Sequence, residues 1–347
     1  MLRCIARPRF AALAFACGVG AAGCSAASVG STAAADKPLA SASSPASTAT
    51  QLGGTEGTVA PLTGLTVSAG VAQRPAVAVA VAGPDPAELG AADVVLEEMT
   101  SPVRFLAVFQ SAQASQVGPV AATRPMDGQA LSVLHPVTGY AGGTSSFISV
   151  LDATKIVDGG YAAHPAAYAP GPAGMTVSTS ALAAAGQSDG PPPELLPYRS
   201  AGAPLASAGE SHPTSVRVTI PGQPVQQWSF DTRTNRWVET AGGPLVSVAN
   251  LIVQVVAFKT VYLNRKYGET TQSARVIGAG RVIVFSGATA GGAGGTSAAG
   301  TWYKPGLAGL TDYFDAARLP MSFGPGPTWI ILAPAGTSTS QVSGGQP

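Results

Sequence analysis

The sequence predicts an α+β fold with two domains. Residues 59–205 combine short apolar runs, typical of buried strands, with segments of helical character, so we expect a mixed α/β N-terminal domain. Residues 206–335 contain several short strand-like runs separated by turn residues, which predicts a mostly antiparallel β C-terminal domain. Residues 158–212 are rich in Gly, Pro and Ala, as is typical of a domain boundary.

Short apolar runs predict the strands of the N-terminal domain. Residues 76–82 (AVAVAVA) stand before a Gly-Pro pair and predict a buried strand. Residues 93–110 predict an antiparallel hairpin in which Glu97 lies opposite Arg104, where an ion pair would contribute about 0.2–1 kcal/mol. Glu97 and Glu98 face opposite sides of a strand, so they cannot form one paired carboxylate site.

Two helical segments follow these strands. Residues 129–134 predict a helical turn, and residues 144–153 predict a helix that follows the glycine-rich turn at Gly142 and Gly143. Backbone amides at such a helix start can hold an anion. A tight strand-to-helix turn explains the same glycines, and this is the interpretation we favour.

Three large aromatic residues, Trp228, Phe230 and Trp237, lie on one predicted hairpin of the C-terminal domain. They either form a surface for a glycan or a protein, or pack the core of their sheet, which is the alternative we favour. Residues 287–300 are glycine-rich and predict a flexible surface loop. The expected strands are 216–220, 228–230, 236–238, 250–258, 281–285 and 328–332.

The first 24 residues predict an export signal that is not part of the fold. Three arginines within the first nine residues form a cationic start, residues 10–19 form an apolar core, and small residues lead to Cys24. This order is that of a secretory signal. The apolar core is too short to span a bilayer as a helix.

Cys24 indicates a lipoprotein signal. Small residues directly before a cysteine resemble the bacterial lipobox, in which the thiol takes a diacylglycerol and becomes the new N-terminus. Ala21 stands where the lipobox more often has Leu, and ordinary secretion with cleavage near Ala22 or Ala27 is the alternative. The other two cysteines lie within the signal, so the exported chain would have no internal disulfide. Two acyl chains would anchor it stably.

Two terminal segments are predicted to be disordered. Residues 25–58 show no hydrophobic periodicity and predict a tether with a typical reach of about 30 Å. Residues 336–347 predict a disordered tail.

Composition and motifs argue against several functional classes. The chain has 19 basic and 18 acidic residues, so it offers no basic surface for nucleic acid. His135, His164 and His212 each precede a proline, which indicates turns or loops rather than a metal-ligand cluster. No motif for nucleophilic catalysis, a P-loop or a dinucleotide site is present. We therefore predict no metal, no cofactor and no enzymatic activity.

The candidate binding site lies in the N-terminal domain. Our functional hypothesis is a polar pocket in which Arg124 binds an anionic group, since a guanidinium suits bidentate recognition of carboxylate or phosphate. In the structural alternative, which we favour, Arg124 pairs with Asp127 or Glu97 and joins loops. The candidate residues are Arg104, Arg124, Asp127, Tyr140, Gly142 and Gly143.

Sequence blocks along residues 60–335 carry a family resemblance. They are PLTGL, RPAVAVAV, ADVVLEE, VRFLAVFQ, VGPVAATRPMD, YAGG, NLIVQVVAFK, RVIGAGRVIVFSG, GTWYKP and GPTWIILAP. In this order they resemble the YerB-like lipoproteins, the DUF3048 family. The resemblance implies a bacterial surface lipoprotein with two domains and no established enzymatic activity, and some members are connected with cell-wall synthesis. The Ala- and Gly-rich composition indicates a GC-rich, actinobacterial genome.

Two departures from the family pattern concern the candidate site. The family usually reads V-G-P-V-R-S-A-R, whereas Ala121 here replaces the first arginine. A polar block expected in residues 165–180 is replaced by YAPGPAGM. These losses favour a partner-binding role over small-molecule chemistry.

The expected function is that of a membrane-anchored, extracytoplasmic lipoprotein that binds or scaffolds an envelope protein. The alternative is capture of a small anionic molecule in the N-terminal domain. A third hypothesis, a hydrolase that uses Glu97, Glu98 or Asp127, would require perturbed carboxylates in a pocket.

Overall fold

The computed structural model describes most of the chain beyond the predicted tether, and the described residues belong to one compact unit, Thr55–Pro347. In this part of the chain no helix is long and apolar enough to cross a membrane. Cys24, the predicted signal and nearly all of the predicted tether lie outside the described residues. The described residues are 57–343, except 84–85, 155, 187–189, 204, 206, 208–209 and 242–245.

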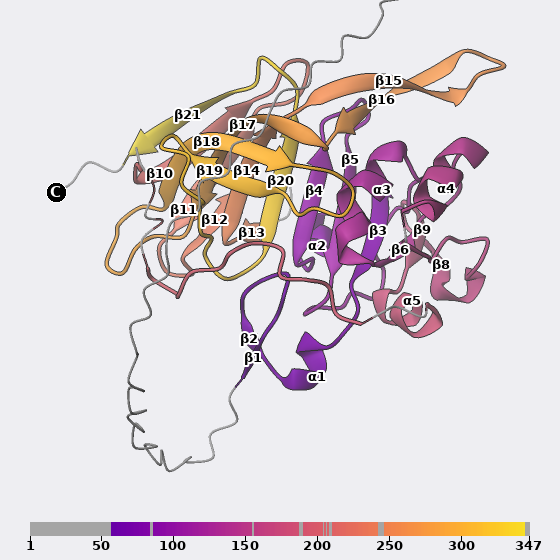
Figure 1. Ribbon diagram of the computed structural model, residues 1–347, viewed down its shortest axis with the longest axis horizontal. Helices are drawn as coiled ribbons and strands as arrows, with labels where there is room; N and C mark the ends of the chain where they lie inside the picture. The colour runs from indigo at the N-terminus through magenta and orange to yellow at the C-terminus, as the bar shows by residue number, and fades with distance from the viewer. Residues whose placement is uncertain are drawn as a thin grey trace, which may run out of the picture. The chain divides into compact units, whose positions relative to one another are not determined.

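A ten-stranded sheet runs through the body of the protein (Figure 1). At its middle, β4 (Val94–Glu98) and β20 (Thr328–Ala333) pair in parallel, although they are far apart in the sequence. The other strands extend the sheet on both sides. Beside β4 lie β5 (Arg104–Phe109), β3 (Val77–Ala82), β6 (Val137–Gly139) and β7 (Val157–Asp158); beside β20 lie β14 (Asn250–Val255), β17 (Gly278–Ser286), β18 (Thr296–Lys304) and β19 (Asp312–Asp315).

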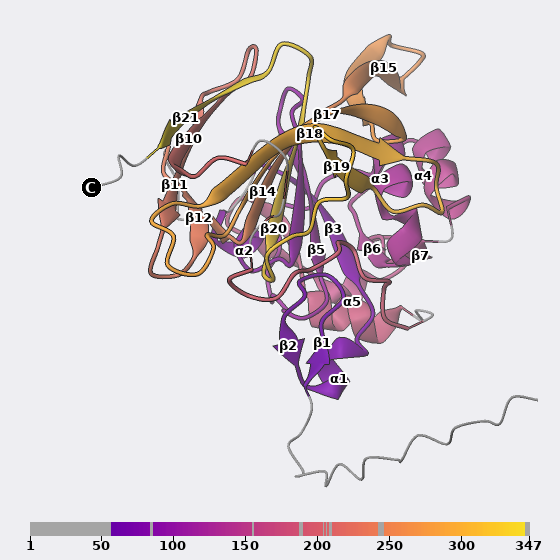
Figure 2. The same cartoon turned by 60° about the vertical axis from the view of Figure 1, so that its left-hand side comes forward.

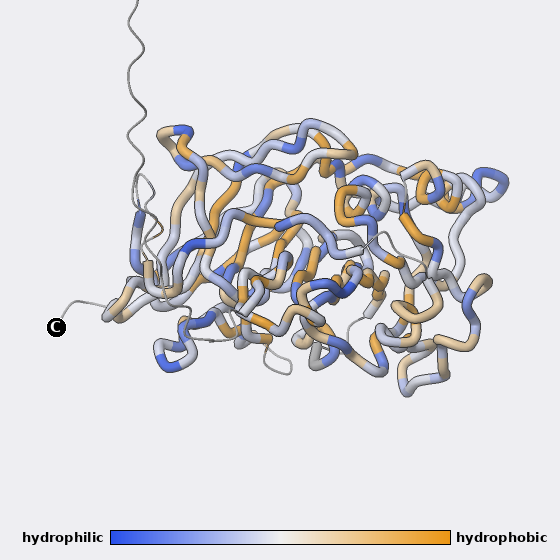
Figure 3. Tube along the Cα trace, turned by 60° about the horizontal axis from the view of Figure 1, so that its bottom comes forward, coloured by the Kyte–Doolittle hydropathy of each residue, from blue (hydrophilic) through white to orange (hydrophobic). Residues whose placement is uncertain are grey.

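The predicted buried strand is β3, and its sequence explains why the sheet is covered on both faces. Neighbouring side chains of a strand point to opposite faces. The alanines of residues 76–80 therefore belong to one core cluster and the valines of residues 77–81 to the other. Apolar segments run through the interior strands, as Figure 3 shows. Such a strand reads as a continuous apolar run because neither face meets water.

A second, five-stranded sheet covers the face that bears the valines. Its residues Trp228 and Trp237 are buried, with ring centroids 6.1 Å from Trp329 and 5.6 Å from Phe285, respectively. Phe230 is half-buried against Trp237. The predicted core packing of these aromatic residues is confirmed. The strands are, in order, β13 (Ser247–Val248), β12 (Arg236–Glu239), β11 (Gln226–Asp231), β10 (Pro213–Thr219) and β21 (Ser338–Ser343).

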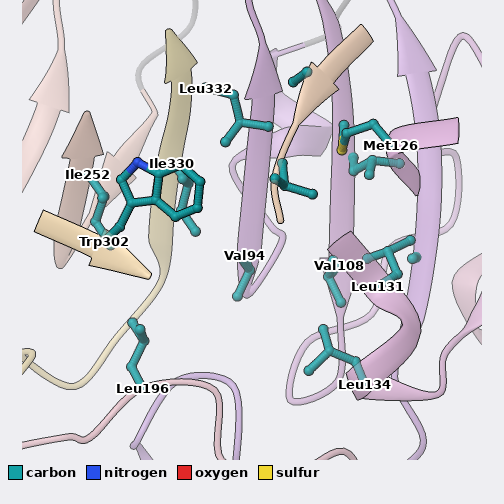
Figure 4. Packing of buried hydrophobic residues seen from close by; sticks show 14 of the residues in the cluster. Val94, Val108, Met126, Leu131, Leu134, Leu196, Ile252, Trp302, Ile330 and Leu332 are labelled. Atoms are coloured by element: carbon teal, nitrogen blue, oxygen red, sulfur yellow. The ribbon is translucent and has the colours of Figure 1, made fainter. Parts of the chain in front are cut away.

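Short helices from the first half of the chain cover the face of the main sheet that bears the alanines of β3, which we call the alanine-bearing face. The helix α3 (Pro125–Leu131), continued by η1 (Ser132–Leu134), packs its apolar side chains on this face (Figure 4). The helix α4 (Ser145–Asp152) confirms the predicted helix, and Thr144 Oγ1 accepts a hydrogen bond from the N–H of Phe147 as its N-cap. The remaining elements are α1 (Ala69–Ala72), α2 (Pro86–Leu89), η2 (Pro165–Ala167), α5 (Thr179–Ala185) and the strand pairs β1 (Thr58–Val59) with β2 (Thr66–Val67) and β8 (Tyr168–Gly171) with β9 (Gly174–Val177).

A two-stranded hairpin projects from the body of the protein (Figures 1 and 2). It consists of β15 (Ala257–Asn264) and β16 (Glu269–Arg275), joined by a turn in which Gly268 has a φ of 69°. Within the described part of the chain neither strand pairs with a third strand.

The observed fold corrects the predicted fold class. The described chain is mostly β rather than α+β, since its helices are few and short. The second half is mostly antiparallel, as predicted, with one parallel pair, β14 with β20. The main sheet also continues from the first half of the chain into the second through β4 and β20, so neither half has a main sheet of its own.

Two predictions of flexible segments are wrong. Ser338–Ser343 are not a disordered tail, because they form β21 and pair with β10. Residues 296–300 are not a loop, because they begin β18 and pair with β17. A Cβ at Gly295 would lie 2.4 Å from the ring of Trp237, so glycine serves close packing at this position.

Candidate functional site

The register of the first hairpin differs from the predicted one by one residue. Arg104 lies opposite Glu98, and Glu97 lies opposite Phe105. The predicted pair of Glu97 with Arg104 is therefore wrong, because the connection between the strands is one residue longer than assumed. A shift by one residue exchanges the two faces of a strand. The prediction that Glu97 and Glu98 face opposite sides is confirmed by their different partners.

Arg104 and Asp127 form a bidentate ion pair inside the protein. Arg104 Nη1 donates to Asp127 Oδ1 over 2.7 Å, and Nη2 donates to Oδ2 over 2.5 Å. Arg104 is 1% exposed and Asp127 0%. Two parallel charge-assisted bonds of this kind are the strongest that a guanidinium makes with a carboxylate. The pair fixes the start of α3 on β5.

Asp127 also caps the helix on which it lies. Its Oδ2 accepts hydrogen bonds from the backbone N–H of Arg124 over 3.0 Å and from Thr123 Oγ1 over 3.1 Å. A carboxylate in the first turn satisfies amide groups that have no partner within the helix. The predicted ion pair of Arg124 with Asp127 or Glu97 is not formed, because Asp127 receives the backbone N–H of Arg124 and the guanidinium of Arg124 faces Glu98.

The guanidinium of Arg124 binds Glu98. The distance from Nη1 to Glu98 Oε2 is 3.3 Å, and the same Nη1 donates to Thr100 Oγ1 over 3.1 Å. The other oxygen of Glu98, Oε1, accepts a hydrogen bond from the N–H of Ala274 in β16 over 2.8 Å. We call these four charged residues, Glu98, Arg104, Arg124 and Asp127, the ion cluster. It joins β4, β5, α3 and the base of the projecting hairpin.

Burial and mutual attraction oppose each other within the ion cluster. Burial raises the pKa of Glu98, while Arg104 and Arg124 act in the opposite direction. Burial also favours the neutral form of Arg104, but Asp127 and Glu98 raise the pKa of this guanidinium above its ordinary value. Two cations thus balance two anions, so the cluster carries no excess positive charge for an added anion. This charge balance favours a role for Arg124 in joining segments of the chain over a role in binding an anion.

Glu97 lies on the other face of the sheet, among aromatic residues. Its Oε1 accepts from Gln226 Nε2 and its Oε2 from Trp329 Nε1, each over 2.8 Å. Burial raises the pKa of this carboxyl, although both hydrogen bonds lower it. The two donors belong to β11 and β20, so Glu97 joins the two large sheets.

The remaining candidate residues lie outside the ion cluster. The hydroxyl of Tyr140 donates to Asp158 Oδ1 over 2.9 Å. The carbonyl of Gly142 accepts from the N–H of Thr123 over 3.1 Å, and Gly143 has a φ of 143°. The glycines thus form a tight turn that supports the segment before α3.

The carboxylates are engaged with protein groups. Both oxygens of Glu97, Glu98 and Asp127 accept hydrogen bonds or face a guanidinium, and all three side chains are buried. The described residues contain no group of three or more His, Cys, Asp or Glu side chains that could hold a metal ion. This arrangement holds elements together and presents no exposed carboxylate to a substrate.

Sequence reasoning missed the roles of three residues in this arrangement. Glu98 is the partner of Arg104 in place of the predicted Glu97, because the turn, whose length sets the register, is one residue longer than predicted. Ala274 contributes only a backbone N–H, which carries no signal in the sequence. Thr123 donates its hydroxyl to Asp127 at the start of α3, as a capping residue would. Its position four residues before Asp127 is the one signal of this role in the sequence.

The fold is mostly β and is built from two segments of the chain, which share the main sheet and meet at the buried ion cluster. The chain belongs to the DUF3048 family of proteins of unknown function: the N-terminal domain of the family matches residues 62–179 and the C-terminal domain matches residues 216–330. The two-part organisation and the family resemblance predicted from the sequence are thereby confirmed. The unmatched residues between the two segments fall largely within the predicted boundary.

The fold is similar to that of a solved member. The crystal structure of the YerB protein from Bacillus subtilis aligns with a TM-score of 0.62 at 19% sequence identity, and the alignment covers 82% of this chain and 100% of that chain. A comparison with curated proteins finds no match. At this identity the likeness shows the common fold.

Proposed function

We propose that this protein is a non-catalytic lipoprotein of the cell envelope that binds another envelope protein through its projecting hairpin. The observation that carries the proposal is the group of large side chains exposed at the end of β15 and β16. Tyr262, Leu263 and Tyr267 are 46%, 39% and 68% exposed, respectively. Exposed aromatic residues beside cations are typical of the centres of protein interfaces.

Cations hold these rings in an ordered arrangement. The guanidinium carbon of Arg265 lies 4.9 Å from the ring centroid of Tyr262, and Lys266 Nζ lies 5.2 Å from that of Tyr267. Each contact contributes about 0.5–1 kcal/mol at an exposed site. Because the rings are partly ordered in advance, these side chains lose less freedom of motion when a partner binds.

The charge of the hairpin indicates the chemistry of the partner. Residues 257–275 contain four basic residues and one acidic residue, Glu269, although the whole chain has a formal net charge of only +1. A surface of this kind is complementary to an acidic protein segment. Complementary charge raises the rate of association and disfavours basic partners.

The free edge of β15 supports a protein partner over a lipid surface. In the described part of the chain β15 pairs only with β16, so the backbone groups along its outer edge have no strand partner. An extended segment can add to such an edge by backbone hydrogen bonds. Hydrocarbon could not satisfy those groups.

The ion cluster supports the same function by holding the hairpin at its base. Glu98 accepts from the N–H of Ala274, and Ser273 beside it is buried. A binding element that is fixed at one end positions its exposed tip better than a free loop does.

Anchoring rests on the sequence. The order of cationic start, apolar core and small residues before Cys24 supports export and lipidation. The alternative of a small anion bound by Arg124 receives less support, because that guanidinium already faces Glu98. The same engagement of the buried carboxylates favours a protein without hydrolase activity.

Crosslinking in intact cells tests the proposal. A photoreactive residue in place of Tyr267 should capture an envelope protein with an acidic segment, and a charge reversal at Lys266 (Lys266→Glu) should reduce that capture. A photoreactive residue in place of Leu319, which is 58% exposed outside the hairpin, is the matched control. Capture of lipid alone, or equal capture of the same proteins from both positions, would overturn the proposal. Loss of capture in Cys24→Ala would support the anchor.

A further inference from the structure

A second feature lies on the alanine-bearing face of the main sheet. A partly open pocket lies between β4, β20 and the elements that cover them. Ten of its fourteen lining residues are aliphatic. Figure 4 labels Val94, Leu134, Leu196 and Ile330 of this lining, which come from strands, a 3-10 helix and a loop. Ligand pockets have this character: mostly apolar walls with a few polar groups.

Lys304 is the one charged residue of the lining. It lies at the end of β18 and is 2% exposed, and its Nζ donates to the carbonyl oxygen of Gly309. Among the described residues no carboxylate lies within ion-pair distance of this Nζ. An ammonium group with three donors thus has a neutral oxygen as its protein partner in an apolar wall, an arrangement that costs stability unless an anion completes it.

Two other polar residues of the lining are paired with each other. The hydroxyl of Tyr313 donates to Gln254 Oε1 over 3.0 Å, and both residues line the pocket. The segment between β18 and β19 is held over α3 and η1 by a hydrogen bond from Ser132 Oγ to the carbonyl of Leu307 over 2.5 Å. Lys304 is therefore the group that an anion entering the pocket would meet.

We propose that this pocket binds a small molecule with an apolar body and a single anionic group, which pairs with Lys304. The apolar body replaces water against the aliphatic walls, and the anion supplies the charge partner that the protein does not provide. Carboxylate and phosphate monoester are the two anionic groups of this chemistry. The site is separate from the hairpin and goes beyond the proposed function.

Protonation of Lys304 links binding to pH. Burial lowers the pKa of its ammonium group to about 8. An anion favours the charged form, so binding takes up a proton above that pH. The affinity should then fall by about tenfold for each pH unit between 8 and the pKa of the complex.

Calorimetric titration of the purified full chain tests the site. The probes are octanoate, octyl phosphate, octylamine and octanol. We expect saturable binding of at least one anion, weaker binding of octanol and none of octylamine. The stronger of the two anions identifies carboxylate or phosphate as the natural group. Binding of octanoate should weaken by about 10- to 100-fold in Lys304→Met, the range for loss of a charged hydrogen bond, and should persist in Lys304→Arg.

Arg233→Met is the matched control, because it removes an exposed cation from the turn between β11 and β12, outside the pocket lining, and should leave binding unchanged. The Lys304→Met variant keeps the length of the side chain and removes a buried charge, so it should fold, and near-ultraviolet circular dichroism verifies this. Equal binding of octanoate and octylamine would overturn the proposal. So would unchanged binding of the anions in Lys304→Met, or the absence of binding of either anion to the unaltered protein.

Discussion

The N–H of Ala274 donates a hydrogen bond to Glu98 Oε1 over 2.8 Å, across 176 residues of sequence. Through this contact one carboxylate at the middle of the main sheet holds the base of the projecting hairpin. The other oxygen of the same carboxylate faces Arg124. A substitution of Glu98 should therefore destabilise the base of the hairpin more than it destabilises the five-stranded sheet.

Substitution of Glu98 by alanine should loosen the hairpin base. A hydrogen bond to a charged group contributes about 1.5–3 kcal/mol, so the amide of Ala274 should exchange its hydrogen about tenfold faster or more. Hydrogen exchange followed by NMR measures this. Amides of β10, which have no contact with Glu98, serve as the internal control. Unchanged protection of Ala274 would contradict the role of this contact.

Loss of the carboxylate of Asp127 should strongly destabilise the fold. The Asp127→Ala variant leaves Arg104 buried without its bidentate partner, and breaking a buried pair in this way costs about 3–5 kcal/mol. Urea denaturation measures the free energy of unfolding. Asp152→Ala, at an exposed position in α4, is the matched control and should change it by no more than about 0.5 kcal/mol. A similar effect of both substitutions would argue against the ion cluster as a structural centre.

Glu97 should make stability depend on pH in the acidic to neutral range. Burial raises the pKa of its carboxyl in the folded state above the ordinary value of 4.5. The folded protein therefore holds a proton that the unfolded chain releases, so stability falls as pH rises from about 4.5 through the raised pKa. In Glu97→Gln this part of the pH dependence should be absent. Denaturation of both proteins between pH 4 and 8 tests the prediction, and parallel curves would refute it.

Lys304 should reduce stability in the absence of ligand. Its folded pKa of about 8 lies below its ordinary value of 10.5, because burial disfavours the charge. Below pH 8 the charged ammonium group has a lower free energy in the unfolded chain than in the folded protein, which lowers the free energy of unfolding. This loss of stability disappears as pH rises from about 8 to 10.5. Lys304→Met should therefore be about 1–3 kcal/mol more stable at pH 7, the usual penalty for an uncompensated buried polar group. A less stable variant at pH 7, or a difference that does not shrink at alkaline pH, would contradict this.

The sequence predicts the interior strands well, because their patterns are strong. The apolar run of residues 76–82 could only be buried, and the hairpin of β4 with β5 follows from two adjacent apolar runs. The buried tryptophans and the helix after the Gly142–Gly143 turn are predicted for similar reasons. The local sequence is sufficient to predict an element wherever burial or a helix cap determines that element.

Other elements carry no local signal. The strand β21 is built of Ser, Thr and Gln residues with one valine, and pairs with β10 through its backbone, so its composition resembles that of a tail. The parallel pairing of β4 with β20 depends on residues far apart in the sequence. The ion cluster required the correct register, and one residue in the length of a turn decided whether Glu97 or Glu98 joined it.

The position of β20 has a consequence for how the protein comes into being. Residues 328–333 complete the middle of the main sheet, yet synthesis and any passage across a membrane deliver them more than 200 residues after β4. Until they arrive, β4 has an open edge, and β14 lacks its parallel neighbour. An open apolar edge of this kind is prone to pair with other chains. The nascent protein therefore needs protection until β20 emerges, and a chain that stops before residue 328 should aggregate rather than persist as two folded halves.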